Sequence, residues 1–391
     1  MNDKISSKKT VLATVLMSLL LSGCGSEDSG TSGNGSQAGD NSPENVTRLK
    51  INATSYNNWT YVNLDDAAVV TLSEEQAADS NAWHLAFRRH AVKSNGGASG
   101  SGLVQVALAD EQAEFYNEAE PVANVFLNAD ASQYLADLEK TYAQDQLAFS
   151  QDSQQPVIAG ADWYIYNPTT HTLSANTANA WLVRHADGDT YSKVWLTDLA
   201  AQADRSYQLV LGFETQAADT TQFAGGERSV TAAMAQGSSE ICVDLDSAAA
   251  VDCNAALADW DLRFEISRES TALWTNGGVY GGGSGATMGT QTKTDLMAYT
   301  SATSVDGQSI LSHYQADRST SVFDEHSWYG YGLAGANDHQ LYPNFRTFVI
   351  DTNKDDADSA QYSLQLINYY SLGGSGTPEI RFIKHSISQG Q

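Results

Sequence analysis

Trp260-Asp261-Leu262-Arg263-Phe264, followed by Asn276-Gly277-Gly278, forms a pattern that occurs once earlier in the chain in the same order. The earlier copy is Trp83-His84-Leu85-Ala86-Phe87 followed by Asn95-Gly96-Gly97. Two further elements come after each copy: a Trp-Tyr-x-Tyr segment with a histidine behind it, and a hydrophobic segment before a Tyr-Ser strand. They stand at Trp163 to Tyr166 with His171, Trp328 to Tyr331 with His339, Trp181 to Val183 before Tyr191, and Phe348 to Ile350 before Tyr362. Such self-similarity indicates duplication, so the sequence predicts two homologous units of ordinary domain size, 51–213 and 240–391, joined by 214–239.

Short segments with strand character make up most of both units, since aromatic and β-branched residues dominate them or alternate with polar ones. In the first unit we expect strands at Trp59 to Leu64, Trp83 to Arg89, Leu103 to Leu108, Trp163 to Tyr166, Trp181 to Arg184, Tyr191 to Leu196 and Tyr207 to Phe213. In the second we expect them at Trp260 to Ile266, Arg346 to Asp351, Tyr362 to Tyr369 and Glu379 to Lys384. The predicted fold is mainly β: two tandem homologous antiparallel β domains with minor helix.

Two local patterns refine this prediction. Asn95-Gly96 and Asn276-Gly277 predict tight two-residue hairpin turns, because Asn-Gly accepts the positive φ angles that such turns require. One helix is expected from Ser132 to Tyr142, with Asp130 or Ser132 as its cap and apolar residues on one face.

The first residues have the pattern of a secretory signal: lysines, an apolar run from Val11 to Leu21, and small residues before Cys24. This run is too short to span a bilayer. A cysteine at the cleavage point makes residues 1–23 resemble a bacterial lipoprotein signal, which implies acylation of Cys24. Residues 24–50 are rich in Gly, Ser, Asp and Asn and predict a flexible tether. Gly25 after Cys24 resembles the signal for sorting to the outer membrane.

Charge and cysteine content narrow the function classes. The formal net charge of −26 argues against nucleic acid and against anionic head groups as partners. Cys242 and Cys253 are the remaining cysteines of an exported chain, and we expect them to form a disulfide rather than a metal site, because neither has a close Cys or His neighbour. Motifs of serine hydrolases, zinc peptidases and phosphate-binding loops are absent from the sequence.

The second unit in particular resembles the HmuY family of haem-binding lipoproteins. The resemblance lies in the Trp-Asp-hydrophobic-x-Phe strand, the Asn-Gly-Gly with a Ser-Gly behind it, the Trp-x-x-Tyr segment and the closing strand pair that ends at Ile380-Arg381-Phe382. It covers nearly all of the chain from Tyr56 to His385, although His84 stands where that family usually has Asp. It implies a lipid-anchored β protein of the outer membrane, surface-exposed or released, that binds haem for iron acquisition and passes it to a TonB-dependent haem receptor.

Side chains such as His, Met and Tyr can hold haem iron, and the chain has eight histidines. His339 is the first candidate ligand, and His171 holds the same place in the first unit. His326 and His313 lie in the region where the family places its other ligand, so each is a candidate partner of His339, and Tyr329 is a candidate for stacking on the porphyrin. Other candidate ligands are Met288 and Met297 in the second unit and Tyr134 or Tyr142 in the first. For His84, His90, His185 and His385 we expect surface positions.

These features favour a binding protein with haem as cargo, and not an enzyme. An adhesin or glycan-binding surface lipoprotein is the alternative, with exposed Trp and Tyr beside Asp and Asn as its site. A structural envelope protein without a ligand is a third possibility. A sharpened Soret band on mixing with haemin separates the first class from the other two.

Overall fold

The computed structural model describes residues 45–142, 144–235, 237–254, 260–268 and 270–385. The predicted signal peptide, Cys24 and most of the predicted tether lie outside this part of the chain. The end of the predicted tether forms strand β1 (Thr47–Lys50), which pairs with β29 (Glu379–His385). Within the described residues, no helix is long and apolar enough to cross a membrane.

The strands form two β sandwiches, which we call body A and body B. Body A has a four-stranded sheet, β3-β2-β4-β5, and a five-stranded sheet, β1-β29-β28-β27-β6. Its remaining strands are β2 (Thr60–Asn63), β3 (Ala68–Val70), β4 (Leu85–Arg88), β5 (Ala91–Ser94), β6 (Gln105–Asp110), β27 (Thr347–Asp351) and β28 (Gln361–Asn368). Phe87 on the small sheet and Phe348 and Leu364 on the large sheet belong to one buried core, so the two sheets pack face to face.

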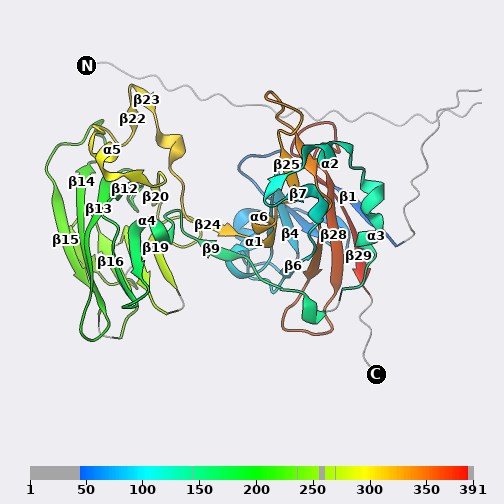
Figure 1. Cartoon of the computed structure of the whole chain (residues 1–391), viewed down its shortest axis with the longest axis horizontal. Helices are drawn as coiled ribbons and strands as arrows, with labels where there is room; N and C mark the ends of the chain where they lie inside the picture. Colours follow the sequence, from blue (N-terminus) through cyan, green and yellow to red (C-terminus); the bar gives the residue numbers. More distant parts are fainter. Residues whose placement is uncertain (1–44, 143, 236, 255–259, 269, 386–391) are drawn as a thin grey trace, which may run out of the picture. The chain divides into compact units, whose positions relative to one another are not determined.

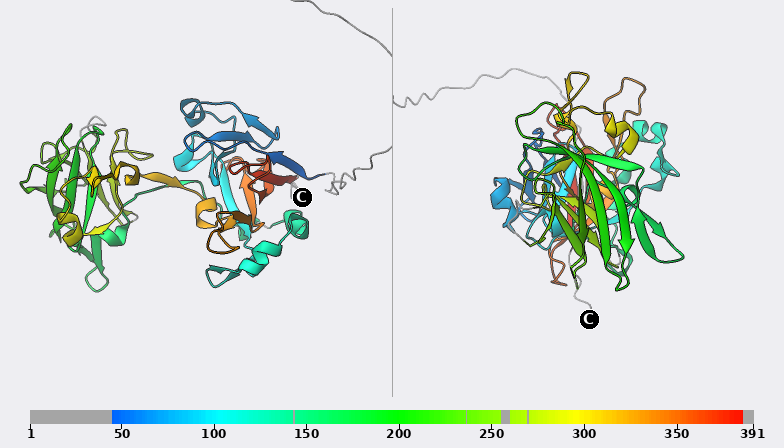
Figure 2. Two further views of the ribbon diagram at one scale, coloured as in Figure 1. Left: turned by 90° about the horizontal axis from the view of Figure 1, so that it is seen from above. Right: turned by 90° about the vertical axis from the view of Figure 1, so that its left-hand side faces the viewer.

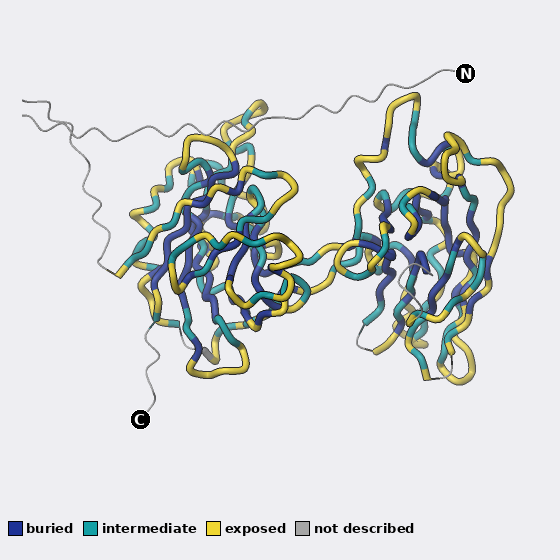
Figure 3. Tube along the Cα trace, turned by 180° about the vertical axis from the view of Figure 1, so that it is seen from behind, coloured by how far each residue is buried: buried dark blue, intermediate teal, exposed yellow. Residues whose placement is uncertain are grey.

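Body B repeats this arrangement with the sheets β17-β16-β18-β19 and β15-β14-β13-β12-β20. Its strands are β12 (Asn179–Arg184), β13 (Tyr191–Ala201), β14 (Tyr207–Gln216), β15 (Arg228–Ala233), β16 (Glu240–Asp244), β17 (Ala249–Val251), β18 (Leu262–Ile266), β19 (Thr271–Thr275) and β20 (Ala286–Thr287). Phe264 on the small sheet and Val194 and Phe213 on the large sheet share the core. The right-hand view of Figure 2 shows the green strands as one twisted sheet, and Figure 3 shows dark-blue buried stretches inside each body with yellow exposed stretches around them.

Smaller elements complete the two bodies. Those of body A are α1 (Glu74–Ala78), α2 (Ala123–Asn128), α3 (Leu135–Leu138), α6 (Val322–Glu325), β7 (Tyr116–Asn117), β8 (Glu120–Pro121), β25 (Tyr329–Tyr331), β26 (Leu341–Pro343) and 3-10 turns at Gly97–Ser99, Ala113–Phe115, Ala131–Tyr134 and Gln144–Gln146. Those of body B are α4 (Gly160–Trp163), α5 (Lys293–Met297), β10 (Tyr164–Asn167), β11 (Thr172–Ala175), β21 (Gln291–Thr292), β22 (Ser304–Val305), β23 (Gln308–Ser309) and a 3-10 turn at Leu311–His313.

Each body takes one half from each predicted unit. Body A combines β1 to β6 with β25 to β29, and body B combines β10 to β15 with β16 to β20. Figure 1 shows this as blue and red strands in one body and green and yellow strands in the other. The chain passes between the bodies at β9 (Ser153–Gln155) and β24 (Arg318–Thr320), which pair with each other. The predicted units 51–213 and 240–391 are therefore not the units that share a core.

The predicted linker 214–239 does not connect the bodies. Its residues end β14, form β15 and begin the approach to β16, and β14 pairs with β15 within one sheet. The reason is that both halves joined by these residues belong to body B: the second half of the first predicted unit ends in β14, and the first half of the second predicted unit, beginning at β16, packs against it in the same sandwich. Cys242 and Cys253 lie in the same region with a Cα–Cα distance of 5.2 Å, and their sulfur atoms are bonded as predicted.

Two local predictions are corrected. The two-residue turn of the β4–β5 hairpin falls at Arg89-His90, not at Asn95-Gly96. Asn95 is buried and its side chain donates to the carbonyls of Ser80 and Trp83, and Asn276 donates in the same way to Trp260. The asparagines are thus buried anchors of wider loops. The predicted helix is capped by Asp130 but ends at Leu138, before Tyr142.

Candidate functional site

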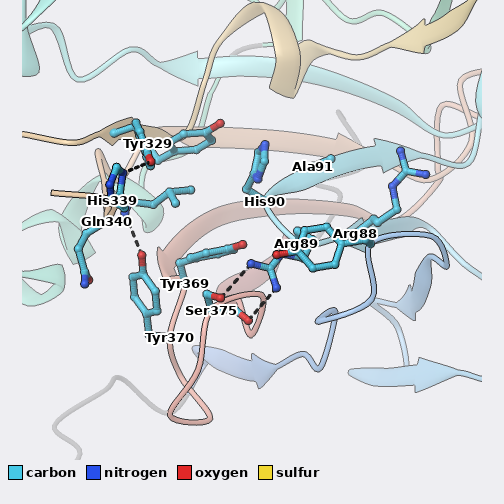
Figure 4. Close-up of a pocket in the computed structure, with 13 residues that line it drawn as sticks. Arg88, Arg89, His90, Ala91, Tyr329, His339, Gln340, Tyr369, Tyr370 and Ser375 are labelled. Atoms are coloured by element: carbon cyan, nitrogen blue, oxygen red, sulfur yellow. Dashed lines mark hydrogen bonds between the residues drawn. The ribbon is translucent and has the colours of Figure 1, made fainter. Parts of the chain in front are cut away.

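Body A contains a pocket of about 850 Å³ whose walls come from both halves of the chain. One wall is the β4–β5 hairpin, and another is the β25–β26 hairpin (Figure 4). The lining residues are Tyr56, Arg88, Arg89, His90, Ala91, Tyr329, Tyr331, His339, Gln340, Leu341, Tyr369, Tyr370 and Ser375. Neither predicted unit supplies all of these walls.

The β4–β5 hairpin holds His90 at the pocket. Arg88 pairs with Ala91, so Arg89 and His90 are the two residues of the turn, and Arg89 has a φ of 57° in the left-handed region. The amide of Arg89 donates to the carbonyl of Ala53 over 2.8 Å, and the indole Nε1 of the buried Trp328 donates to the carbonyl of His90 over 2.9 Å. A non-glycine residue in this conformation needs such support from its surroundings. The turn is therefore fixed by residues that are remote in sequence.

The imidazole of His90 packs edge-on against Tyr329, with ring centroids 5.4 Å apart. Burial lowers the pKa of His90, and the neighbouring positive charge of Arg89 lowers it further, against a weaker opposite effect of Asp324. A lowered pKa keeps this side chain neutral at pH 7. Neutral imidazole has a free nitrogen lone pair, which is the form that binds a metal.

His339 lies across the β25–β26 hairpin from Tyr331. Its Nδ1 is hydrogen-bonded to the hydroxyl of Tyr331 over 2.8 Å, while both residues stay exposed. The carboxylate of Asp338 accepts from the amides of Ala334 and Gln340 and so shapes the loop before His339. These backbone hydrogen bonds lower the pKa of Asp338, with that from Ala334 foremost. Because Nδ1 is engaged, Nε2 of His339 is the nitrogen left to meet a ligand.

Two arginines bring positive charge to the pocket of this acidic protein. The guanidinium of Arg89 donates to the carbonyl and the hydroxyl of Ser375 and stacks on the ring of Tyr56, 4.4 Å from its centroid. Arg88 lies over the ring of Trp59 at 4.5 Å. Guanidinium groups held in this way are suited to bind carboxylates.

Tyrosines provide the apolar part of the wall. Burial raises the pKa of Tyr329 and of Tyr369, so both are neutral phenols at pH 7. Tyr370 accepts a hydrogen bond from the amide of Leu341 over 3.0 Å and thereby ties the β28–β29 connection to β26. The pocket is therefore aromatic on its walls and basic at the β4–β5 hairpin.

The pocket contains some of the site residues predicted from the sequence and not others. His339 and Tyr329, both predicted, line the pocket. His326 follows α6 and His313 ends a 3-10 turn in body B, and neither is among the lining residues. His90 was expected at the surface, and Arg89, Tyr56, Tyr369 and Tyr370 were not singled out. The run of two arginines and a histidine at 88–90, which ends β4 and forms its turn, is the sequence feature that could have indicated them.

Body B carries a second tyrosine–histidine pair. The hydroxyl of Tyr166 is 2.7 Å from Nδ1 of His171, across the β10–β11 hairpin. His171 was predicted as the counterpart of His339, and the structure gives both the same kind of partner. His171 is exposed and has a φ of 56°.

Three other histidines occupy structural positions. His84 and His185 are buried, contrary to the prediction, and His385 is half-buried against the hydroxyl of Ser363. His84 accepts a hydrogen bond from the amide of Leu64 at Nδ1.

His185 links Ser192 to Asp246 in the manner of a hydrolase triad. Its Nε2 is 2.8 Å from the hydroxyl of Ser192 and its Nδ1 is 2.9 Å from a carboxylate oxygen of Asp246. Burial would lower the pKa of His185, but Asp246 and Asp261 together raise it above its ordinary value. Both Ser192 and His185 are 0% exposed. A substrate cannot reach the hydroxyl, so the network ties strands together.

A comparison with known protein families gives a match over the first part of the described chain. Residues 55–211 match the HmuY family, described as HmuY protein. The matched segment contains the β4–β5 hairpin with His90 and the β10–β11 hairpin with His171, which lie in different bodies. No curated protein sequence matches the chain significantly.

Proposed function

We propose that this chain, whose residues 55–211 belong to the HmuY family, captures haem in the pocket of body A and delivers it for iron acquisition. Haem is the cargo and not a resident cofactor. The protein coordinates haem and releases it.

The observation that carries the proposal is that one pocket offers the three kinds of group that haem needs. Imidazoles of His90 and His339, on two different hairpins, are available to the iron. Arg88 and Arg89 can pair with the propionate carboxylates, and Tyr329 and Tyr369 offer apolar faces to the porphyrin plane. A pocket of about 850 Å³ is within the range of sites for ligands of this size.

The two imidazoles have different supports. We assign Nε2 of His339 as one axial ligand, with Tyr331 holding its Nδ1 and so fixing the ring orientation. We assign His90 as the opposite ligand, because its turn is anchored by Trp328 and its lowered pKa keeps it neutral. His326, which together with His313 was predicted from the sequence as a candidate partner of His339, is the alternative for this second position.

The envelope location rests on the sequence of the first residues and on the family. Cys24 would carry the lipid, residues 26–45 would hold the folded bodies clear of the outer membrane, and a TonB-dependent receptor would take the haem. Intact mass spectrometry and membrane fractionation of wild type and Cys24→Ala test the anchor. A wild-type chain without acyl groups in the soluble fraction would refute it.

Haemin titration tests the binding site. The wild type should give a sharpened Soret band of a six-coordinate, low-spin complex. His90→Ala and His339→Ala should each remove one axial bond and convert this complex to a high-spin form, and the double variant should lose the Soret shift from this pocket altogether.

His313→Ala and His326→Ala are the matched controls and should retain the wild-type spectrum. If His326→Ala gives the high-spin form and His90→Ala does not, His326 is the partner of His339. A wild type that produces no Soret change at all would contradict the proposal and favour an adhesin or glycan-binding lipoprotein.

A further inference from the structure

The tyrosine–histidine pair occurs twice, although the loops that hold it have different lengths. Tyr166 and His171 are 5 positions apart, and Tyr331 and His339 are 8 apart. Yet the hydroxyl lies 2.7 Å from Nδ1 in the first pair and 2.8 Å in the second, and the ring centroids are 6.2 Å apart in both. Loops that differ in length do not retain one hydrogen bond through backbone geometry alone. The side chains themselves are what the two hairpins share.

The surroundings of the two pairs also agree. Tyr166 pairs across its hairpin with Leu173, as Tyr331 does with Leu341. The amide of Leu173 donates to the hydroxyl of Tyr207 over 3.1 Å, which repeats the hydrogen bond from Leu341 to Tyr370. At the start of each hairpin a buried tryptophan packs edge-on against the following tyrosine, at 4.9 Å for Trp163 and Tyr164 and 5.1 Å for Trp328 and Tyr329.

The two bodies differ in the hairpin that faces the tyrosine–histidine pair, which is β4–β5 in body A and β18–β19 in body B. In body A, Nε1 of Trp328 donates to the carbonyl of His90. In body B, Nε1 of Trp163 is buried and has no hydrogen-bond partner among the described residues. The β18–β19 hairpin, which corresponds to β4–β5, has a longer turn through Ser267 and Arg268 and carries no histidine.

We propose that Tyr166 and His171 form a second haem site, in which His171 Nε2 is the one axial ligand that the protein supplies. Tyr166 is a positioning residue that holds Nδ1 of His171. With one axial ligand from the protein in place of two, this site binds haem more weakly than the pocket of body A and leaves one axial position of the iron open. This inference rests on the proposed function.

The test is a haemin titration of the full chain, followed by Soret absorption and by electron paramagnetic resonance at each step. The first equivalent should produce the low-spin complex of body A and the second a high-spin ferric signal. His171→Ala should remove the second equivalent and leave the low-spin signal of the first unchanged. Tyr166→Phe should keep the second equivalent but broaden its signal, because the ring of His171 is no longer held.

His339→Ala is the matched control: it should convert the first equivalent to a high-spin form as well, so that this variant still takes up two equivalents and both are high-spin. Saturation of the wild type at one equivalent would overturn the second site while leaving the first intact. A second equivalent that persists in His171→Ala would show nonspecific adsorption and would also overturn it. A wild type that binds no haemin would end both proposals.

Discussion

Trp328 and Trp163 provide a matched pair of substitutions for testing how the haem pocket is held. Both indoles are buried, and each packs against a tyrosine that follows it. Only Trp328 has a hydrogen-bond partner for its Nε1 among the described residues, namely the carbonyl of His90 at 2.9 Å. Replacing either tryptophan by phenylalanine therefore removes a similar side-chain volume. The two variants differ in one respect: Trp328→Phe removes an N–H donor that has a partner, and Trp163→Phe removes one that has none.

The expected magnitudes follow from this difference. The loss of ring volume costs about 1 kcal/mol in both variants. Trp328→Phe also loses a hydrogen bond worth about 1 kcal/mol, so its free energy of unfolding should fall by about 2 kcal/mol. Trp163→Phe removes a buried donor without a partner, and with it an unfavourable desolvation free energy of about 1–3 kcal/mol. Its stability should therefore change little or rise slightly.

Urea denaturation of the two variants, with haemin titration of each, measures both effects. Trp328→Phe should also weaken the low-spin haem complex, because the turn that carries His90 is no longer anchored, whereas Trp163→Phe should leave that complex intact. Equal losses of stability in the two variants would refute the assignment of the Trp328 hydrogen bond as the support of the pocket.

Three further predictions concern the architecture and its dependence on conditions. Each body contains halves of both units, so the two fragments cut at a protease site inserted into the exposed loop 217–227 should stay bound to each other and elute together in size-exclusion chromatography. Separate elution of the fragments without denaturant would refute the mixed cores. Burial raises the pKa of Asp152 and of Asp317 to about 6. Because a folded-state pKa above the unfolded value of about 3.9 makes the native state bind the extra proton, each carboxyl should reduce stability as pH rises from about 4 to about 6, by up to about 3 kcal/mol. Asp152→Asn should flatten this slope in pH-dependent denaturation, and an unchanged slope would contradict it. The double variant Cys242→Ala, Cys253→Ala should lower the free energy of unfolding of body B by about 2–3 kcal/mol, measured by calorimetry. It should leave the low-spin haem spectrum unchanged, and a change in that spectrum would show that the haem pocket depends on body B.

Strand positions were predictable from sequence because they depend on local patterns. Trp59 to Leu64, Tyr191 to Leu196 and Tyr362 to Tyr369 each contain or overlap an observed strand. The predicted helix was overextended because Tyr142 continued the apolar spacing, although its hydroxyl instead donates to the carbonyl of Asp137. Asn95-Gly96 was misread because its side chain has buried partners that no local pattern reveals.

The pairing of halves was not predictable, for a physical reason. When two units carry the same pattern, each strand finds an equally suitable partner in either copy, so local sequence does not specify which copy completes a sheet. The sequence predicts a surface position for His90 for a related reason: a turn of charged residues has the composition of a solvated surface. Its role depends on Trp328 and Tyr329, which lie more than two hundred positions away along the chain.

The most direct test of the haem assignment is a crystal structure of the haemin complex, with the iron located by anomalous diffraction. The strongest iron peak should lie in the pocket of body A, within bonding distance of His90 and of Nε2 of His339, with the propionates toward Arg88 and Arg89. The absence of an iron peak from this pocket, or a peak in the pocket bonded to neither His90 nor His339, would contradict the proposed site.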